Sequence, residues 1–177
     1  DGDYMFTFSD TVSNAGTAPV SLSSYGRVTR FDKPTHASIY VLHEGLIGVT
    51  GEEGLHEIKY AKIEEDKAVV PGKSTDGWLG ITDKYWALAV VPSGKQPFQP
   101  RFSYLEDGRT RYQSDFLTDT ITIAPGASDT IETLVFAGAK EVAKVQAYES
   151  DRQIRQFDLL IDWGWFYFIT KPMFWLI

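Results

Sequence analysis

Short segments rich in β-branched and aromatic residues, separated by turn residues, run along most of this chain and constrain its fold more than any other feature. About a dozen such segments occur between Tyr4 and Gly138, at the close spacing typical of antiparallel sandwiches and barrels. β-Branched and aromatic side chains favour strands because they pack well on a pleated, half-buried surface. The pattern therefore predicts a mainly β protein built as a large antiparallel sandwich.

The segment YWALAVVP (residues 85–92) predicts the centre of that sandwich, because it carries almost no polar side chain and is expected to be buried on both faces. Two residues join it to WLGIT (78–82), a spacing that predicts a tight connection. We expect Tyr85 and Trp86 to enter the core. The alternative is that TDKYW (82–86) places this aromatic pair in a ligand groove.

Strand boundaries elsewhere follow from the same pattern. YMFTF (4–8) and PVSL (19–22) flank the turn residues NAG (14–16) and resemble a hairpin. ASIYVL (37–42) and HEIKYAKI (56–63) also have the composition of strands.

Near the C-terminal end, one helix is predicted from Ala139 onward, because Val142, Val145 and Tyr148 recur at intervals of three with charges between them. This face is expected to lie on a sheet. FDLLID (157–162) then alternates enough to predict a further strand.

Few residues point to catalysis or to a bound cofactor. The chain has no cysteine, and its formal net charge of −7 opposes attraction to nucleic acid. Its three histidines lack a zinc-binding spacing. A sugar mutarotase would use a histidine and a carboxylate for proton transfer, and His43, Glu44 and Asp83 supply those groups nominally. Their surroundings favour a strand end and turns, so we predict no catalytic residue, metal or cofactor.

The last seventeen residues, IDWGWFYFITKPMFWLI (161–177), are unlike an ordinary water-exposed surface, since only Asp162 and Lys171 carry charge. Tyr and Trp prefer the boundary between lipid headgroups and hydrocarbon. Residues 163–168 therefore predict a short helix lying at a membrane surface, and Pro172 would break it. MFWLI beyond it is typical of the opening of a membrane-spanning segment. The alternative is a C-terminal segment packed into its own core.

Five stretches together carry a resemblance to a known family. In order along nearly the whole chain they are YGRVTR (25–30), LHEGLIGV (42–49), GWLGITDKYWALAVVP (77–92), FAGAKEV (136–142) and DWGWFYFITKPMF (162–174). They resemble the periplasmic domain of the YidC family of bacterial membrane protein insertases, in its alphaproteobacterial form. The chain lacks an initiator Met and a signal peptide and stops within an apolar run, so we interpret it as a piece of a longer polypeptide.

The resemblance implies a galactose mutarotase-like β-supersandwich with short C-terminal helices. Residues 1–162 would form the periplasmic domain, including the helix near 139–149. Residues 163–177 would form the interfacial amphipathic helix and the start of a transmembrane helix. The domain would stand in the periplasm as part of a multi-pass inner-membrane protein, whose transmembrane core receives nascent inner-membrane proteins and lies outside this chain. Insertase activity cannot reside in this piece alone, and a fold reused without mutarotase chemistry is expected.

The resemblance also implies partners and sites. Expected partners are the Sec translocon with its accessory proteins SecD and SecF, and the lipid bilayer through the C-terminal segment. The helix sensitive for partners and insertion carries Lys140, Glu141, Val142, Val145 and Tyr148. The residues expected at the membrane interface are Trp163, Trp165, Phe166, Tyr167, Phe168, Phe174 and Trp175. A carbohydrate-binding or mutarotase-like sandwich is the alternative function.

Overall fold

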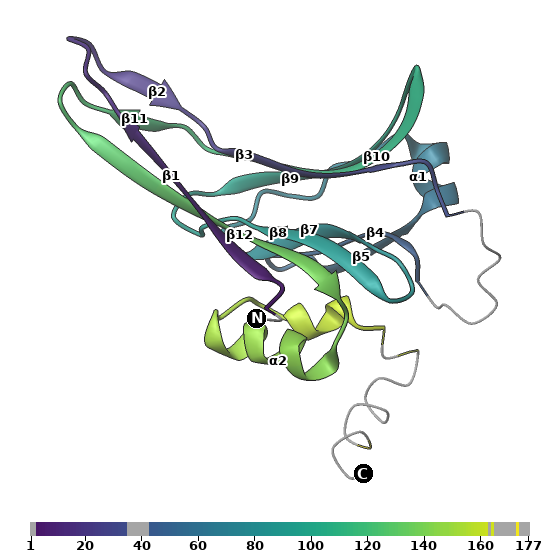
Figure 1. The fold of residues 1–177 in the computed structure, drawn as a ribbon. Helices are drawn as coiled ribbons and strands as arrows, with labels where there is room; N and C mark the ends of the chain where they lie inside the picture. Colours follow the sequence, from purple (N-terminus) through teal and green to yellow (C-terminus); the bar gives the residue numbers. More distant parts are fainter. Residues whose placement is uncertain (1–2, 35–42, 163, 165–172, 174–177) are drawn as a thin grey trace.

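Two antiparallel sheets stacked face to face form the body of the protein in a computed structural model that describes residues 3–34, 43–162, 164 and 173 (Figure 1). The larger sheet has six strands in the order β1-β12-β8-β7-β4-β5, and the second has four in the order β3-β10-β9-β6. A third, two-stranded sheet pairs β11 with β2 at one end of the molecule (Figure 1). The predicted mainly β antiparallel sandwich is thereby confirmed.

The bounds of the elements are as follows. The six-stranded sheet contains β1 (Met5–Ser13), β4 (Gly45–Thr50), β5 (Gly54–Lys59), β7 (Gly77–Thr82), β8 (Trp86–Val91) and β12 (Ser128–Ala139). The four-stranded sheet contains β3 (Tyr25–Phe31), β6 (Ala68–Val69), β9 (Phe98–Asp107) and β10 (Arg109–Thr118). The small sheet contains β2 (Val20–Leu22) and β11 (Ile121–Ile123). The helices are α1 (Tyr60–Asp66), α2 (Val142–Asp151) and the 3₁₀ helix η1 (Phe157–Leu160).

The six-stranded sheet is apolar on both faces, so two hydrophobic cores form on either side of it. The inter-sheet core lies between the two large sheets and contains Val28, Leu46, Ile58, Tyr60, Ile63, Leu79, Ile81, Val90, Phe98, Phe102, Tyr112 and Phe116. The outer core lies between this sheet and the C-terminal helices and contains Met5, Ile47, Val49, Trp78, Ala87, Ala89, Val91, Phe136, Val145, Ile154, Phe157 and Leu160. Alternate residues of each central strand serve the two cores in turn, as the period of a strand requires.

The β7–β8 hairpin lies at the centre of the sheet, as its sequence predicts. The tight connection is confirmed, since the Asp83 backbone N–H donates to the Trp86 carbonyl at 2.8 Å. Gly77 has φ +130°, and a Cβ there would lie 2.0 Å from the Val49 carbonyl oxygen, so glycine is required for this close approach. Trp78 next to it is fully buried in the outer core.

The prediction that Tyr85 and Trp86 enter the core is wrong. Tyr85 is 64% exposed and Trp86 is 61% exposed. By strand alternation the Trp86 side chain lies on the same face as Leu88 and Val90, the inter-sheet face. Trp86 is however the first residue of β8, at the end of the sheet, where the neighbouring layer does not cover it.

The predicted N-terminal hairpin is also wrong in its pairing. The turn at Asn14 forms, with the Asn14 Oδ1 accepting from the Gly16 N–H at 3.0 Å and the Asn14 Nδ2 donating to the Ala18 carbonyl at 2.9 Å. β1 however continues to Ser13 and pairs along its whole length with β12, while β2 pairs with β11. Local turn chemistry was correct, but the strand partners come from far along the chain.

Three boundaries near helices differ from the predictions. The segment predicted as a strand over 56–63 ends as a strand at Lys59, and α1 follows because Tyr60 and Ile63 bury one side of a helical turn. The segment predicted as a strand over 157–162 contains η1, Phe157–Leu160, instead. Residues 139–141 precede α2, because Ala139 is still paired with Trp86 in the sheet. The strand predicted over 37–42 lies outside the described residues.

Candidate functional site

The C-terminal layer, defined here as residues 142–160 and thus α2, η1 and the turn between them, covers the outer face of the six-stranded sheet (Figure 1). Val145 of α2 and Phe157 of η1 are fully buried against the sheet, and Ile154 and Leu160 join them. Burial of these four side chains, and not helix propensity, accounts for the docking, since α2 has no side-chain cap at its N-terminus.

Aromatic rings pack between the layer and the sheet. The Phe157 ring lies 5.3 Å from the Trp78 ring and 5.6 Å from the Phe136 ring, in both cases edge to face. The Tyr148 ring lies 6.1 Å from Phe136. The Trp78 indole N–H donates to the Arg155 carbonyl at 3.1 Å, so this buried polar atom is satisfied by the layer itself. The layer is therefore fixed in position as well as buried.

The N-terminal residues are tied to the same layer. The Tyr4 backbone N–H donates to the Tyr148 hydroxyl at 2.9 Å, and the Tyr4 hydroxyl donates to Glu141 Oε1 at 2.7 Å. The Tyr148 hydroxyl donates in turn to the Asp3 carboxylate, which lowers the pKa of Asp3. The Lys144 ammonium lies 4.0 Å from the centre of the Tyr4 ring, within cation–π range. The beginning and the end of the domain are thus joined at α2.

The chain leaves the layer beside a group of polar side chains at one end of the six-stranded sheet. Asp162 Oδ2 accepts from the His43 backbone N–H at 2.9 Å, and Asp162 Oδ1 accepts from the Gly164 N–H at 3.0 Å. Lys140 Nζ donates to Thr82 Oγ1 at 2.9 Å. Burial lowers the pKa of Lys140, and the carboxylates of Asp162, Asp83 and Glu44 oppose that shift. These contacts hold Asp162 against the end of the sheet at which β4 begins.

The predicted partner-sensitive residues divide into two groups. Val145 is buried and Tyr148 packs on the outer core, so the predicted inward face of the helix is confirmed for these two residues, with Val142 half-buried at its start. Lys140 and Glu141 precede the helix. Every predicted membrane-interface residue lies outside the described residues: Trp163, Trp165, Phe166, Tyr167, Phe168, Phe174 and Trp175. Ile154 was missed, and Phe157 was predicted in a strand, although Phe157 and Leu160 show helical i, i+3 spacing.

Two of the three groups named above for a mutarotase, His43 and Asp83, make contacts of other kinds. The His43 ring is buried and its Nε2 hydrogen-bonds the Leu46 carbonyl at 3.0 Å, and burial lowers its pKa. Asp83 instead pairs with Arg30 and accepts from the Tyr60 hydroxyl at 3.3 Å, while burial raises the pKa of Tyr60. Both candidates are thus engaged in structural contacts. Within the described ranges, no group of three or more His, Asp or Glu side chains is arranged to hold a metal ion.

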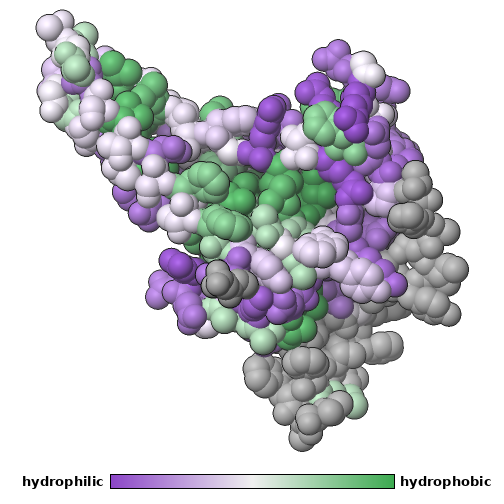
Figure 2. All heavy atoms as spheres, in the orientation of Figure 1, coloured by the Kyte–Doolittle hydropathy of each residue, from purple (hydrophilic) through white to green (hydrophobic). Residues whose placement is uncertain are grey.

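Hydrophobic surface gathers in the gap between the edges of the two large sheets (Figure 2). Phe6 and Phe8 of the edge strand β1 are about half exposed and pair across the sheet with Val135 and Thr133, on the inter-sheet face. Further along, an apolar pocket of about 260 Å³ opens between β1, β12 and the small sheet, lined in part by Val12, Ile123 and Ile131. The inter-sheet core is therefore open along this side.

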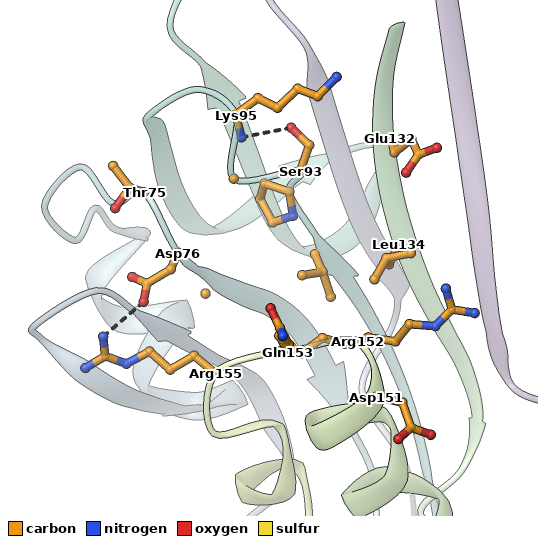
Figure 3. A pocket seen from close by; sticks show the side chains of 15 residues that line it. Thr75, Asp76, Ser93, Lys95, Glu132, Leu134, Asp151, Arg152, Gln153 and Arg155 are labelled. Atoms are coloured by element: carbon orange, nitrogen blue, oxygen red, sulfur yellow. Dashed lines mark hydrogen bonds and ion pairs between the residues drawn. The ribbon is translucent and has the colours of Figure 1, made fainter.

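A second pocket, of about 450 Å³, lies between the turn after β8, strand β12 and the end of α2 (Figure 3). Three cations and three carboxylates line it: Lys95, Arg152, Arg155, Asp76, Glu132 and Asp151. Arg155 points to Asp76 and pairs with it at 3.0 Å, and Lys95 Nζ donates to the Thr130 carbonyl at 2.8 Å. Because the three cations and three carboxylates balance, and Arg155 and Asp76 form an ion pair, the pocket has no dominant charge.

No helix among the residues that the structure describes has both the length and the apolar character needed to cross a bilayer.

Comparisons with known proteins agree on one family. A membrane protein insertase YidC from Mesorhizobium japonicum is 71% identical over 177 residues, which are 100% of this chain and 29% of the relative. YidC from Rhizobium meliloti is 63% identical over 174 residues, 98% of this chain and 29% of the relative. YidC from Brucella melitensis is 60% identical over 178 residues, again 29% of the relative. This chain thus spans less than a third of the length of these curated relatives.

Among solved structures, one described as an aldose 1-epimerase from Klebsiella pneumoniae is similar at 12% identity with a TM-score of 0.44, covering 87% of this chain and 48% of that one. The relatives are named for membrane protein insertion and not for an enzymatic reaction, which agrees with the expectation that the domain is not an enzyme. The model of the YidC periplasmic domain matches residues 1–176. The chain therefore belongs to the YidC periplasmic domain family.

Proposed function

We propose that this chain serves a membrane protein insertase as a non-catalytic module of the periplasm, which acts as scaffold, partner-docking surface and membrane-interface anchor. The observation that carries the proposal is the C-terminal layer, which is buried against the sheet and leads directly into residues 163–177. In this proposal, residues 1–162 form the domain, and residues 163–177 form the interfacial helix and the start of a transmembrane helix.

The whole protein would be a multi-pass protein of the inner membrane. Its clients would be nascent inner-membrane proteins, received by a transmembrane core outside this chain, alone or together with the Sec translocon. The relatives' name and their greater length support this reading. In this proposal residues 1–162 contribute no chemistry; it is supported by the structural contacts of His43 and Asp83, two of the groups that a mutarotase would use.

Partner docking by SecD or SecF would use the solvent face of the C-terminal layer. Because Val145 and Tyr148 pack inward, a partner would meet the opposite side of α2, where Ala143, Ala147 and Ser150 are exposed. Small side chains let another backbone approach closely, and they carry no charge that would have to be desolvated. Lys140, Glu141 and Val142 would act by holding the start of this helix in place.

Membrane attachment is tested by flotation of the 177-residue chain with phosphatidylcholine vesicles. Replacing Trp165 and Phe168 with Ser should lower the vesicle-bound fraction and leave the β-sheet signal in circular dichroism unchanged. The matched control replaces Phe8 and Leu117, two half-exposed apolar residues of the sheets, with Ser. This control should float like the wild type. Equal partitioning of the wild type and the Trp165/Phe168 variant would refute the anchor, and loss of the β-sheet signal would place these rings in the core.

A further inference from the structure

Tyr85 and Trp86 are adjacent aromatic residues that are both more than 60% exposed, at the turn between β7 and β8. Two adjacent exposed aromatic residues are unusual on a surface that meets only water, because each ring leaves a large apolar area unburied. The neighbouring Lys84 places its ammonium 5.0 Å from the centre of the Tyr85 ring. The turn therefore combines two amphipathic rings with one cation.

This turn lies at the end of the sheet from which the chain continues to residues 163–177. Thr82 pairs with Gly45, and Trp86 pairs with Ala139, so the β7–β8 turn, the start of β4 and the end of β12 share one end. Lys140 is anchored there by its backbone N–H, which donates to the Tyr85 carbonyl at 2.9 Å. Asp162, the last residue before the aromatic segment, is bound to His43 two residues before β4 begins.

We propose that Tyr85 and Trp86 form a second contact with the lipid bilayer, beside the one made by residues 163–177. The proposal rests on the membrane attachment proposed above. Trp and Tyr favour the headgroup boundary, where the ring is buried while the indole N–H or the hydroxyl stays hydrated, and Lys84 would meet a lipid phosphate. Two contact points orient the domain, whereas the C-terminal segment alone would leave it free to rotate about residue 162.

Charge favours a bilayer surface that is zwitterionic over one that is strongly anionic. The chain carries a formal charge of −7, and at this end Asp83 is neutralised by Arg30. Aromatic insertion does not require anionic lipid. Attachment should therefore be at least as strong on phosphatidylcholine vesicles as on vesicles that contain phosphatidylglycerol.

The test combines flotation with lipid quenching in the 177-residue chain. Replacing Tyr85 and Trp86 with Ser should lower the bound fraction about tenfold, because two large rings lose their contact with lipid. Trp86 is also its own reporter. Acyl-brominated phosphatidylcholine should remove more emission from the wild type than from a Trp86→Phe variant. Trp163, Trp165 and Trp175 are present in both proteins, and Trp78 is fully buried, so the difference between the two proteins reports on Trp86.

The outcomes separate this inference from the proposed function. The second contact is refuted, while the anchor stands, if the wild type floats and the Trp165/Phe168 variant does not, but the Tyr85/Trp86 variant floats like the wild type. Equal quenching of the wild type and the Trp86→Phe variant would support the same conclusion. If the wild type does not float at all, the anchor is wrong and the inference falls with it. The Phe8/Leu117 control must float like the wild type, since an equal loss there would mean non-specific adhesion of exposed apolar residues. A melting temperature near that of the wild type shows that the Ser variant is folded.

Discussion

The two hydrophobic cores on either side of the six-stranded sheet are closed in different ways. The inter-sheet core has mostly strands on both sides, joined by ladders of hydrogen bonds within each sheet. The outer core has the sheet on one side and the C-terminal layer on the other, with Val145, Ile154, Phe157 and Leu160 as its cover. The first core thus defines the body of the domain, whereas the second joins that body to the segment that leads to residues 163–177.

The largest effects on stability are expected when one phenylalanine is removed from each core, and the two variants should differ in where the structure loosens. Phe102→Ala in the inter-sheet core and Phe157→Ala in the outer core each remove a fully buried ring. Each should lower the free energy of unfolding by about 3–5 kcal/mol. Phe157→Ala should also release the C-terminal layer, so that amide hydrogen exchange accelerates in α2 before it does in β9 and β10. Chemical denaturation and hydrogen exchange on both variants measure these two quantities.

Equal acceleration of amide exchange in α2 and in the strands of the Phe157→Ala variant would contradict this difference between the two cores. The outer core would then be part of one cooperative unit, and the C-terminal layer could not loosen separately. An unchanged exchange rate in α2 would contradict the burial of Phe157 as the main docking contact.

A smaller effect on stability is expected from acid, through His43, whose backbone N–H donates to Asp162. Burial lowers the pKa of His43, and Glu57, Asp162 and Lys59 are the charged groups that act on it. The folded state then binds fewer protons than the unfolded state just below the ordinary pKa of 6.5. The contribution of His43 to the free energy of unfolding should therefore be fully present above pH 6.5. It should be lost as the pH decreases from 6.5 through the lowered pKa of the folded state.

The variant His43→Gln should show a smaller loss of stability between pH 7 and pH 5 than the wild type, as measured by urea denaturation at each pH. His56→Gln is the matched control, because the pKa of His56 is also lowered by burial but its ring lies against Phe102, away from the exit. Only His43→Gln should reduce the acid-induced exchange of the C-terminal layer. An identical pH profile for His43→Gln and the wild type would contradict the burial of His43 as the cause.

The smallest effect on folding is expected at Trp86, which belongs to neither core. Because its side chain is 61% exposed, Trp86→Ala should change the free energy of unfolding by only about 0.5 kcal/mol. Trp78→Ala is the informative contrast within the same hairpin, since Trp78 is fully buried and should cost about 3–5 kcal/mol. A large loss on Trp86→Ala in thermal denaturation would show that this ring is part of a core after all.

Local sequence patterns predicted most strands but not all of their partners. β7 ends at Thr82, where the segment WLGIT (78–82) ends, and the β7–β8 hairpin follows from two apolar segments joined by two residues. The pairing of β1 with β12 joins residues more than 110 positions apart, and no local signal specifies it. The prediction that Tyr85 and Trp86 are buried failed for a related reason, because an apolar strand pattern does not reveal where the opposite layer ends.

The sequence predicted which residues of α2 face the sheet, but it did not predict how the C-terminal layer docks on the sheet. The inward positions Val145 and Tyr148 follow from helical spacing, and the aromatic content of residues 163–177 is evident from the sequence alone. The docking of η1 was missed because FDLLID satisfies a strand pattern as well as a single helical turn. Short apolar segments are ambiguous between these two structures.

Hydrogen exchange of the 177-residue chain with and without phosphatidylcholine vesicles tests most directly whether a water-compatible sandwich meets the membrane at one end. We expect vesicles to slow exchange in residues 163–177 and in the turn at residues 83–86, and to leave exchange in the small sheet of β2 and β11 unchanged. Vesicle-induced protection at β2 and β11, or no protection anywhere, would contradict this expectation.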